Sequence, residues 1–225
     1  MKKICIAIDK SGDDFDLQSF TQQFGGNAMF KIGLEYFTKF GSTGLNKVQS
    51  ELFLDLKFFD IPNTVYHAVR NVCTIKNIFL LTVHASGGME MIKAAVQARN
   101  DSNSKAKIIC VTRLTSENAS IEDILSLTDI AIKANADGIV CSVAEVQEVR
   151  RIYGDGIIIV TPGIRPAWYN VCDDQVRTST PKNAFDVGSN IVVIGRPITQ
   201  SKTPAKALEK ILEEIGSVKE SLREI

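Results

Sequence analysis

Histidine is scarce in this chain, and its cysteines are not arranged in pairs. Only His67 and His84 are present, and neither has a cysteine or a second histidine at the spacing of a structural zinc site. The five cysteines are widely spread, odd in number and free of any C-x-x-C motif, so they indicate reduced core residues rather than a disulfide framework. We therefore expect chemistry that uses no metal and no cofactor.

Long apolar runs are also missing. Segments such as Ile78 to Leu81 and Ile157 to Val160 are far shorter than the roughly 18 residues that a membrane-spanning helix needs. Lys2 and Lys3 precede an apolar segment that ends at Asp9, which is too short for a signal peptide. We expect a cytoplasmic protein with no membrane partner.

Net charge is absent as well, because 26 Lys and Arg residues balance 26 Asp and Glu residues. A chain without net positive charge has no general electrostatic attraction for nucleic acid or anionic lipid, so we expect no nucleic-acid partner. Any anionic ligand must then be held by a local cluster of basic groups.

The rest of the composition is that of an ordinary packed domain. Apolar residues make up 44% of the 225 residues and charged residues 23%, which excludes intrinsic disorder and collagen-like repeats. No segment rich in Pro, Gly or Ser separates two halves of the chain. We expect residues 1–225 to form a single domain.

Apolar, β-rich segments alternate regularly with amphipathic ones, which is typical of parallel α/β folds. Eight candidate strands begin near Ile4, Met29, Glu51, Ile78, Lys107, Gly138, Ile157 and Ile191. Eight such units in a chain of this length predict a (β/α)8 barrel, also called a TIM barrel. An open, doubly wound sheet is the alternative, but no G-x-G-x-x-G motif follows the first strand.

Apolar residues with helical spacing lie between the candidate strands. The stripes comprise Leu17, Phe20 and Phe24; Val65, Val69 and Val72; Met89, Ile92 and Val96; Ile121, Ile124 and Leu125; and Leu208, Ile211 and Ile215. Two helix starts are also marked, at Thr180-Pro181 and Thr203-Pro204, because in each an N-cap residue precedes a proline at the first helical position.

Charged residues on the third candidate strand carry the strongest functional signal, because chemistry in this barrel lies at the carboxyl ends of the strands. Asp55 and Lys57 are two residues apart, so both side chains leave one face of the strand while Leu54 and Leu56 take the other. Charges inside a barrel persist only as a hydrogen-bonded network, which Lys31 on the second strand can join. The alternative is a structural salt bridge at the barrel rim.

The last two units indicate an anion site. About 17 residues without clear periodicity, from Ile164 to Thr180, follow the seventh strand, and a loop of that length usually covers a ligand. This loop holds Arg165, Gln175 and Arg177, and the eighth strand runs into Gly195 and Arg196, which supply close backbone approach and a forked donor. Phosphate sites in this barrel commonly use the loops after strands seven and eight. The alternative is a glycine turn beside a solvated arginine.

These residues lie in motifs that resemble the orotidine 5'-phosphate decarboxylase family over nearly the whole chain. The family's signature D-x-K-x-x-D-I-P-x-T is complete, from Asp55 to Thr64. Further matches, in the family's order, are Ala7-Ile8-Asp9, Phe30-Lys31-Ile32-Gly33, Thr82-Val83-His84-Ala85, Leu114-Thr115-Ser116, Thr161-Pro162-Gly163-Ile164-Arg165, Asp173-Asp174-Gln175 and Ile194-Gly195-Arg196-Pro197. Phe59 departs from the family, which often has histidine at this position, but the position is not a catalytic one.

The resemblance implies a homodimeric barrel that removes CO2 from orotidine 5'-monophosphate to give uridine 5'-monophosphate (UMP), the last step of de novo UMP biosynthesis, without a metal or cofactor. The implied catalytic network comprises Lys31, Asp55, Lys57 and Asp60. Asp9 would hold the ribose, and Thr115 would contact the pyrimidine. The phosphate would be held by Arg165, Gln175, Gly195 and Arg196. Lys31 and Thr64 are also implied substrate contacts. Asp60 and Thr64 would come from the partner subunit.

The reaction leaves negative charge on a ring carbon, with no cofactor to accept it. Lys57 as an ammonium would stabilise the developing carbanion and then protonate it, and flanking Asp55 and Asp60 would keep it charged.

Two alternative functions stay open. One is a magnesium-dependent keto-sugar-phosphate decarboxylase of the same superfamily, against which Lys31 argues, since an acid is expected there. The other is a non-catalytic nucleotide-phosphate binder, which would not need Lys57 and its acids.

Overall fold

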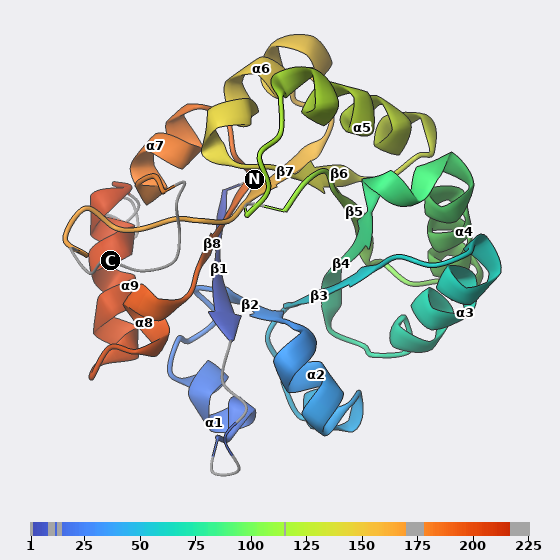
Figure 1. Ribbon diagram of the computed structural model, residues 1–225. Helices are drawn as coiled ribbons and strands as arrows, with labels where there is room; N and C mark the ends of the chain where they lie inside the picture. The colour runs from blue at the N-terminus through green and yellow to red at the C-terminus, as the bar shows by residue number, and fades with distance from the viewer. Residues whose placement is uncertain (1, 9–11, 13–14, 115, 170–177, 217–225) are drawn as a thin grey trace.

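Eight parallel strands close into a single barrel in the order β1 to β8, with β8 paired to β1 (Figure 1). The computed structural model describes residues 2–8, 12, 15–114, 116–169 and 178–216. The strands are β1 (Lys3–Ile8), β2 (Met29–Ile32), β3 (Leu52–Phe58), β4 (Ile78–His84), β5 (Lys107–Val111), β6 (Gly138–Val140), β7 (Ile158–Thr161) and β8 (Ile191–Ile194). The predicted (β/α)8 barrel is confirmed, and every predicted strand start lies within one residue of the observed one.

Helices surround the barrel as an outer ring (Figure 1). They are α1 (Leu17–Gln22), α2 (Leu34–Phe40), α3 (Pro62–Val72), α4 (Gly88–Asp101), α5 (Ile121–Lys133), α6 (Val143–Tyr153), α7 (Pro181–Asp186), α8 (Arg196–Thr199) and α9 (Pro204–Glu214), with short 3-10 turns η1 (Thr43–Leu45) and η2 (Ala85–Gly87). All five predicted stripes fall on or beside helices, whereas α2 and α6 were not among the stripes that the sequence indicated.

The two predicted helix starts differ in how they are capped. Thr180 caps α7 as expected, because its side chain accepts a hydrogen bond from the backbone N–H of Asn183. Thr203 precedes α9 with Pro204 in the first turn, but its side chain makes no capping hydrogen bond. Its ψ of 78° is far from the extended value at Thr180, which is 154°. Proline alone therefore marks the start of α9.

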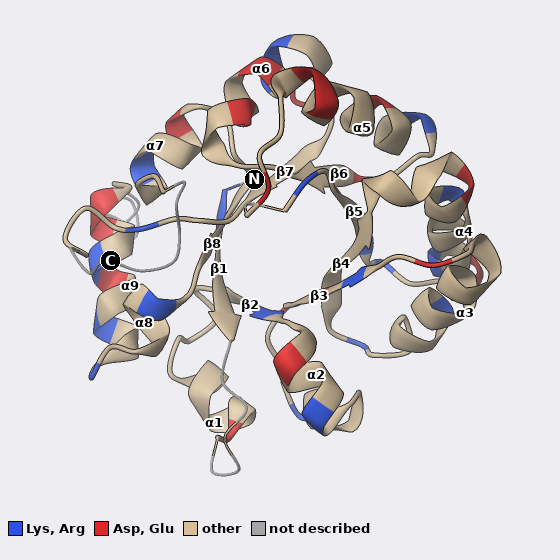
Figure 2. Ribbon diagram, in the orientation of Figure 1, with Lys and Arg blue, Asp and Glu red and all other residues tan. Residues whose placement is uncertain are grey.

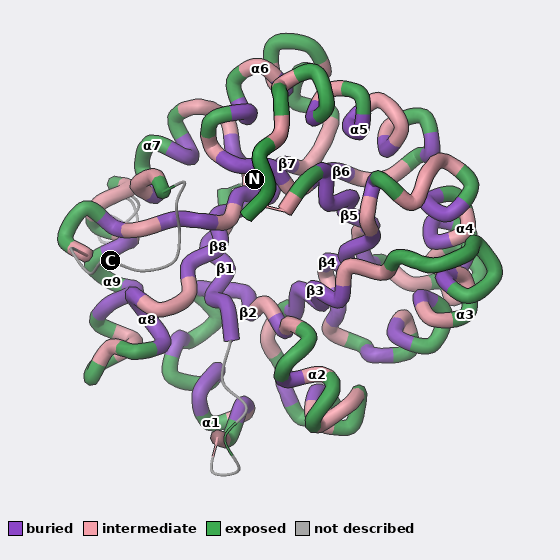
Figure 3. Tube along the Cα trace, viewed as in Figure 1, coloured by how far each residue is buried: buried purple, intermediate pink, exposed green. Residues whose placement is uncertain are grey.

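Two apolar cores follow from the alternation of side chains along the strands. One lies between the barrel and its helices and includes Leu54 and Leu56. The other fills the barrel interior and comprises Cys5, Ala7, Met29, Phe53, Leu80, Ile109, Val160, Ile191 and Val193. The strands are accordingly buried almost throughout, and exposed residues lie on the outer helices and the loops (Figure 3).

Three of the five cysteines are core residues, as the sequence predicted. Cys5, Cys110 and Cys141 are buried and free, Cys73 is half-buried and free, and Cys172 lies outside the described residues. Basic and acidic residues are intermixed around the outer ring of helices (Figure 2). Within the described residues, none of the helices has both the length and the apolar character required to cross a membrane.

Candidate active site

A cavity of about 260 Å³ opens at the carboxyl ends of the strands. It is lined by residues from almost every strand and the segments that follow them, namely Ala7, Lys31, Phe53, Asp55, Lys57, Val111, Arg113, Leu114, Val140, Val160, Pro162, Gly163, Arg165, Val193, Gly195 and Arg196. Apolar side chains form its floor, since Phe53, Val160 and Val193 belong to the core of the barrel interior. Cationic and anionic groups occupy its walls, which is the form of a site for a small polar ligand.

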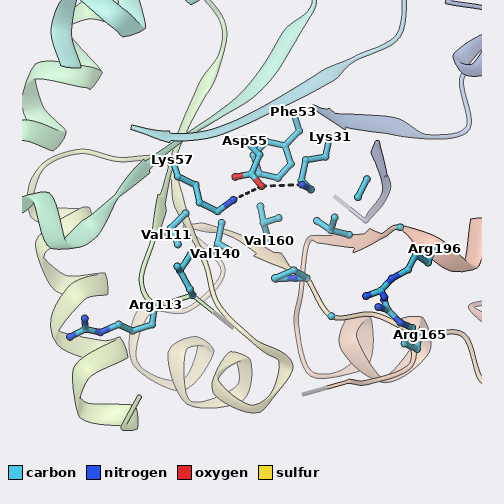
Figure 4. Close-up of a pocket in the computed structure, with 16 residues that line it drawn as sticks. Lys31, Phe53, Asp55, Lys57, Val111, Arg113, Val140, Val160, Arg165 and Arg196 are labelled. Atoms are coloured by element: carbon cyan, nitrogen blue, oxygen red, sulfur yellow. Dashed lines mark hydrogen bonds and ion pairs between the residues drawn. The ribbon is translucent and has the colours of Figure 1, made fainter. Parts of the chain in front are cut away.

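Lys31, Asp55 and Lys57 form an ion-paired cluster at one side of this cavity, here called the Lys–Asp–Lys cluster (Figure 4). Asp55 Oδ2 lies 2.8 Å from Lys57 Nζ and 3.2 Å from Lys31 Nζ. The prediction that Asp55 and Lys57 share a face and that Lys31 joins them is therefore confirmed. Asp55 is buried, and all three residues line the cavity.

The Asp55 carboxylate is charged despite its burial. Burial raises the pKa of this carboxyl, but the charges of Lys31 and Lys57, with hydrogen bonds from Lys57 and Thr82, outweigh that effect. The pKa of Asp55 consequently lies below its ordinary value. The cluster thus holds two lysines around one buried carboxylate, where charges interact more strongly than in water.

The end of β3 departs from a regular strand where it carries Lys57. The pairing with β4 runs through Leu54 opposite Leu81 and resumes at Phe58 opposite Val83, so β3 advances by four residues while β4 advances by two. Lys57 lies in this bulge with φ at +50°, in the left-handed region that costs a residue with a side chain about 1 to 3 kcal/mol. Bulges of this kind often re-aim a side chain beside an active site.

Arg165 and Arg196 lie on the same side of the cavity, away from the Lys–Asp–Lys cluster (Figure 4). Arg165 follows β7, where its N–H donates to the carbonyl of Ser179 at 2.8 Å, so that the two ends of the long loop after β7 are joined. Gly163 in the same turn has a φ of +75°, a conformation that favours glycine. Gly195 precedes the short helix α8, which begins at Arg196. The two loops named from the sequence therefore do place a pair of guanidinium groups at one cavity.

Asp60 and Thr64 are not among the residues that line the cavity of this chain. Both are exposed, and Asp60 accepts a hydrogen bond from the N–H of Ile61 at 2.7 Å. Among the described residues no ion pair joins Asp60 to Lys57. Three further candidates, Asp9, Thr115 and Gln175, lie outside the described residues, as does Arg177.

Sequence reasoning missed one polar member of the site. Thr82 is fully buried on β4 and donates a hydrogen bond to Asp55 Oδ1 at 3.0 Å. Thr82 stands in the family match Thr82-Val83-His84-Ala85, but a lone hydroxyl inside the apolar run Ile78 to His84 is equally typical of an ordinary core threonine, so the sequence assigned it no role. No group of three or more His, Cys, Asp or Glu side chains within the described ranges is arranged to hold a metal ion.

Comparison with known proteins places the chain in a family. Residues 2–211 match the model of the family described as "Orotidine 5'-phosphate decarboxylase / HUMPS family". The chain belongs to this family. Curated relatives named orotidine 5'-phosphate decarboxylase include one from Paramagnetospirillum magneticum, 42% identical with 86% of this chain and 88% of the relative covered, and one from Pseudoalteromonas translucida, 39% identical with 95% and 97% covered.

A solved structure supports the same family assignment. The crystal structure of orotidine 5'-phosphate decarboxylase from Lactobacillus acidophilus superposes with a TM-score of 0.83 at 33% sequence identity. The match covers 96% of this chain and 99% of the other. This chain, with its barrel and its Lys–Asp–Lys cluster, thus aligns with its relatives over most of its length.

Proposed function

We propose that the Lys–Asp–Lys cluster carries out the reaction of this enzyme, the decarboxylation of orotidine 5'-monophosphate to UMP and CO2 in pyrimidine biosynthesis. The reaction itself follows from the family and from relatives that bear this name at 35% identity or more. The single observation that supports the assignment of the cluster is the ion pairing of Lys31 and Lys57 on one buried carboxylate, Asp55.

The reaction needs a charge to be stabilised on carbon. When the bond between C6 and the carboxylate breaks, CO2 leaves as a neutral molecule and the electron pair stays on C6 of the pyrimidine. The Lys57 ammonium stabilises that pair and then transfers a proton to C6, and the resulting amine takes a proton back from solvent. Stabilisation that is stronger in the transition state than in the bound substrate is what accelerates the step.

Asp55 contributes in two ways. Its negative charge holds Lys31 and Lys57 at the cavity wall. It would also face the carboxylate of the substrate, and two such charges about 4 Å apart repel by about 4 kcal/mol at an effective dielectric constant of 20. Loss of CO2 relieves that repulsion. Lys31 compensates part of the charge of Asp55 while the substrate is bound.

The phosphate would be bound at the opposite side of the cavity by Arg165 and Arg196, together with Gly195 and Gln175. Guanidinium groups suit this role because they donate two parallel hydrogen bonds to a phosphate. Asp9 would hold the ribose and Thr115 the pyrimidine. Binding energy from the remote phosphate then positions the ring against Lys57.

We also propose a homodimer in which Asp60 and Thr64 of each subunit complete the other's site. Large apolar side chains stand exposed next to Asp60, since Phe59 is 62% exposed and Ile61 66%. Leu34, which follows the neighbouring strand β2, is 56% exposed. Large apolar side chains exposed at the ends of two neighbouring strands favour a protein interface. A single decarboxylase domain over residues 1–225 and a cytoplasmic location are likewise predictions from the sequence.

One experiment separates this function from the two alternatives. The purified chain is incubated with orotidine 5'-monophosphate, and in parallel with a ketogulonate phosphate, each with EDTA or with Mg2+, and released CO2 is measured. We expect CO2 from the nucleotide alone, at a rate that EDTA does not change. Release only from the keto sugar, and only with Mg2+, would make it the sister enzyme. Nucleotide binding without CO2 from either substrate would make it a binding protein.

A further inference from the structure

Thr82 makes two hydrogen bonds that link β4 to the Lys–Asp–Lys cluster. Its side-chain Oγ1 accepts the backbone N–H of Lys57 at 2.9 Å and donates to Asp55 Oδ1 at 3.0 Å. A threonine hydroxyl has one proton and two lone pairs, so both bonds form at once. Thr82 itself is fully buried.

The two oxygens of Asp55 have separate partners. Oδ2 faces both lysines, at 2.8 Å from Lys57 Nζ and 3.2 Å from Lys31 Nζ. Oδ1 is bound by Thr82. Because the last torsion of an aspartate has only a broad preference, a hydrogen bond to Oδ1 further restricts the plane in which Oδ2 faces the lysines.

The second bond acts on the backbone of the bulge. Lys57 has a φ of +50° where β3 gains two residues on β4, and this left-handed conformation persists only if its surroundings hold it. The bond from the Lys57 N–H to Thr82 lies at this residue and spans the gap between the two strands. The direction in which the Lys57 side chain leaves β3 depends on that conformation.

We propose that Thr82 is the positioning residue of the active site, whose hydroxyl orients the Asp55 carboxylate and holds the Lys57 backbone in its bulge. The inference rests on the proposed function for its effect on turnover. It does not require Thr82 to touch the substrate, and Thr82 does not line the cavity. A residue that acts only through geometry lowers the rate of the chemical step more than it weakens substrate binding.

The test compares Thr82→Val with Thr82→Ser. Valine has the same shape but neither donates nor accepts, whereas serine retains the hydroxyl and loses only a methyl group. We expect Thr82→Val to lower kcat for orotidine 5'-monophosphate by about 10- to 100-fold with KM changed less than about 3-fold. Thr82→Ser should keep kcat within about 3-fold of the wild type. Thr82→Ala is a second variant without the hydroxyl, for use if the valine variant does not fold.

Thr128→Val is the matched control. Thr128 is also fully buried, and its hydroxyl donates to the carbonyl of Ile124 within α5, on the outer ring. This variant reports the cost of deleting a buried threonine hydroxyl elsewhere, and its kcat should equal that of the wild type. A fall in kcat as large as that of Thr82→Val would assign both effects to general destabilisation and overturn the proposal.

A second readout does not depend on activity. Hydrogen exchange of the Lys57 amide should be at least about 10-fold faster in Thr82→Val than in the wild type, and unchanged in Thr82→Ser, because only the valine variant loses the acceptor. Unchanged exchange together with unchanged kcat in Thr82→Val would refute the positioning role. Absence of CO2 from the wild type would instead refute the proposed function, and the exchange rates would still decide the geometry of the bulge.

Discussion

Asp55 is the residue on which the charges of the site converge. It is buried, it pairs with two lysines, and it accepts a hydrogen bond from Thr82. Removing one member of a buried charge network usually costs more than the network contributes, because the remaining charges lose their partner. The cluster should therefore respond to substitution at Asp55 in stability as well as in activity.

The pH dependence of stability isolates the contribution of Asp55. Its pKa is depressed in the folded protein, so the carboxylate stabilises the fold above its unfolded pKa of about 3.9, and this stabilisation is lost as the pH falls through the lower folded value. The Asp55→Asn variant lacks this stabilisation by the carboxylate at every pH. We expect Asp55→Asn to be less stable at pH 7, by about 1.4 kcal/mol for each unit of pKa depression, and the difference to shrink below about pH 4.

Urea unfolding of the two proteins at a series of pH values gives this difference directly. Asp129→Asn is the control, since Asp129 is a partly exposed partner of Lys133 on α5 and surface pairs contribute at most about 1 kcal/mol. A difference between wild type and Asp55→Asn that stays constant from pH 7 to pH 3 would contradict the charged state assigned to Asp55.

At the scale of the elements, the carboxyl ends of β7 and β8 supply the proposed phosphate site. Arg165 follows β7, Arg196 begins α8 after β8, and both line the cavity. Neither residue lies near the Lys–Asp–Lys cluster in the chain, so their meeting at one cavity results from closure of the barrel. In the proposed function, the ends of β7 and β8 bind the phosphate, whereas the end of β3 carries Lys57 for the chemical step.

Substitution of Arg196 tests this division. Arg196→Ala should raise KM and lower kcat for orotidine 5'-monophosphate, with kcat/KM falling by about 10- to 100-fold, because a charge-assisted hydrogen bond contributes about 1.5 to 3 kcal/mol. With orotidine, which lacks the phosphate, the wild type and the variant should be equally slow. Steady-state kinetics with both substrates give these values.

Arg151→Ala serves as the control for Arg196→Ala. Arg151 is an exposed arginine paired with Glu148 on α6, so its loss should leave both substrates unaffected. An unchanged kcat/KM in Arg196→Ala would place Arg196 outside the site, and an equal loss with orotidine would show that it does not act through the phosphate.

The elements also show what the sequence could predict. The period of two along Leu54, Asp55, Leu56 and Lys57 was sufficient to place both charges on one face of β3. The bulge at Lys57 was not predictable, because an extra pair of residues in one strand is visible only against the register of its neighbour. The role of Thr82 was not predictable either, because its two hydrogen-bond partners, Asp55 and Lys57, lie on β3 and not on its own strand.

Short or weakly patterned helices were the other omission. The seven residues of α2 have one buried side chain, Tyr36, which is too little periodicity to recognise. Helix α6 buries Glu145 together with Val146 and Val149, and a buried acid interrupts the apolar stripe by which a helix is identified. The strands were easier to place because each is a compact apolar run.

At the scale of the whole molecule, the proposed dimer makes each site depend on two chains. Asp60 is exposed, lies between the exposed Phe59 and Ile61 in the chain, and accepts a hydrogen bond from the N–H of Ile61. In a symmetric dimer, a residue that enters the neighbouring site does so twice. Each site would then combine Lys57 of one subunit with Asp60 of the other.

Mixing two inactive variants tests the shared site. A heterodimer of Lys57→Ala and Asp60→Ala has one site with both defects and one with neither, so subunit exchange should restore up to about half of the wild-type activity per heterodimer. Activity is measured after exchange has been demonstrated with differently tagged chains. No recovery after exchange would show that Asp60 acts in its own chain, and the decarboxylase activity would not be affected by that result.

In the proposed function, the Lys57 ammonium performs the chemistry while other groups bind the nucleotide. The most direct test of this role is the rate of CO2 release from orotidine 5'-monophosphate by Lys57→Ala, measured on protein whose binding of UMP is determined by calorimetry. We predict that turnover falls by at least about 1,000-fold while UMP binds within several-fold of the wild-type affinity, since Lys31 still neutralises Asp55 and the arginines are intact. Turnover near the wild-type rate in this variant would show that Lys57 does not perform the chemistry.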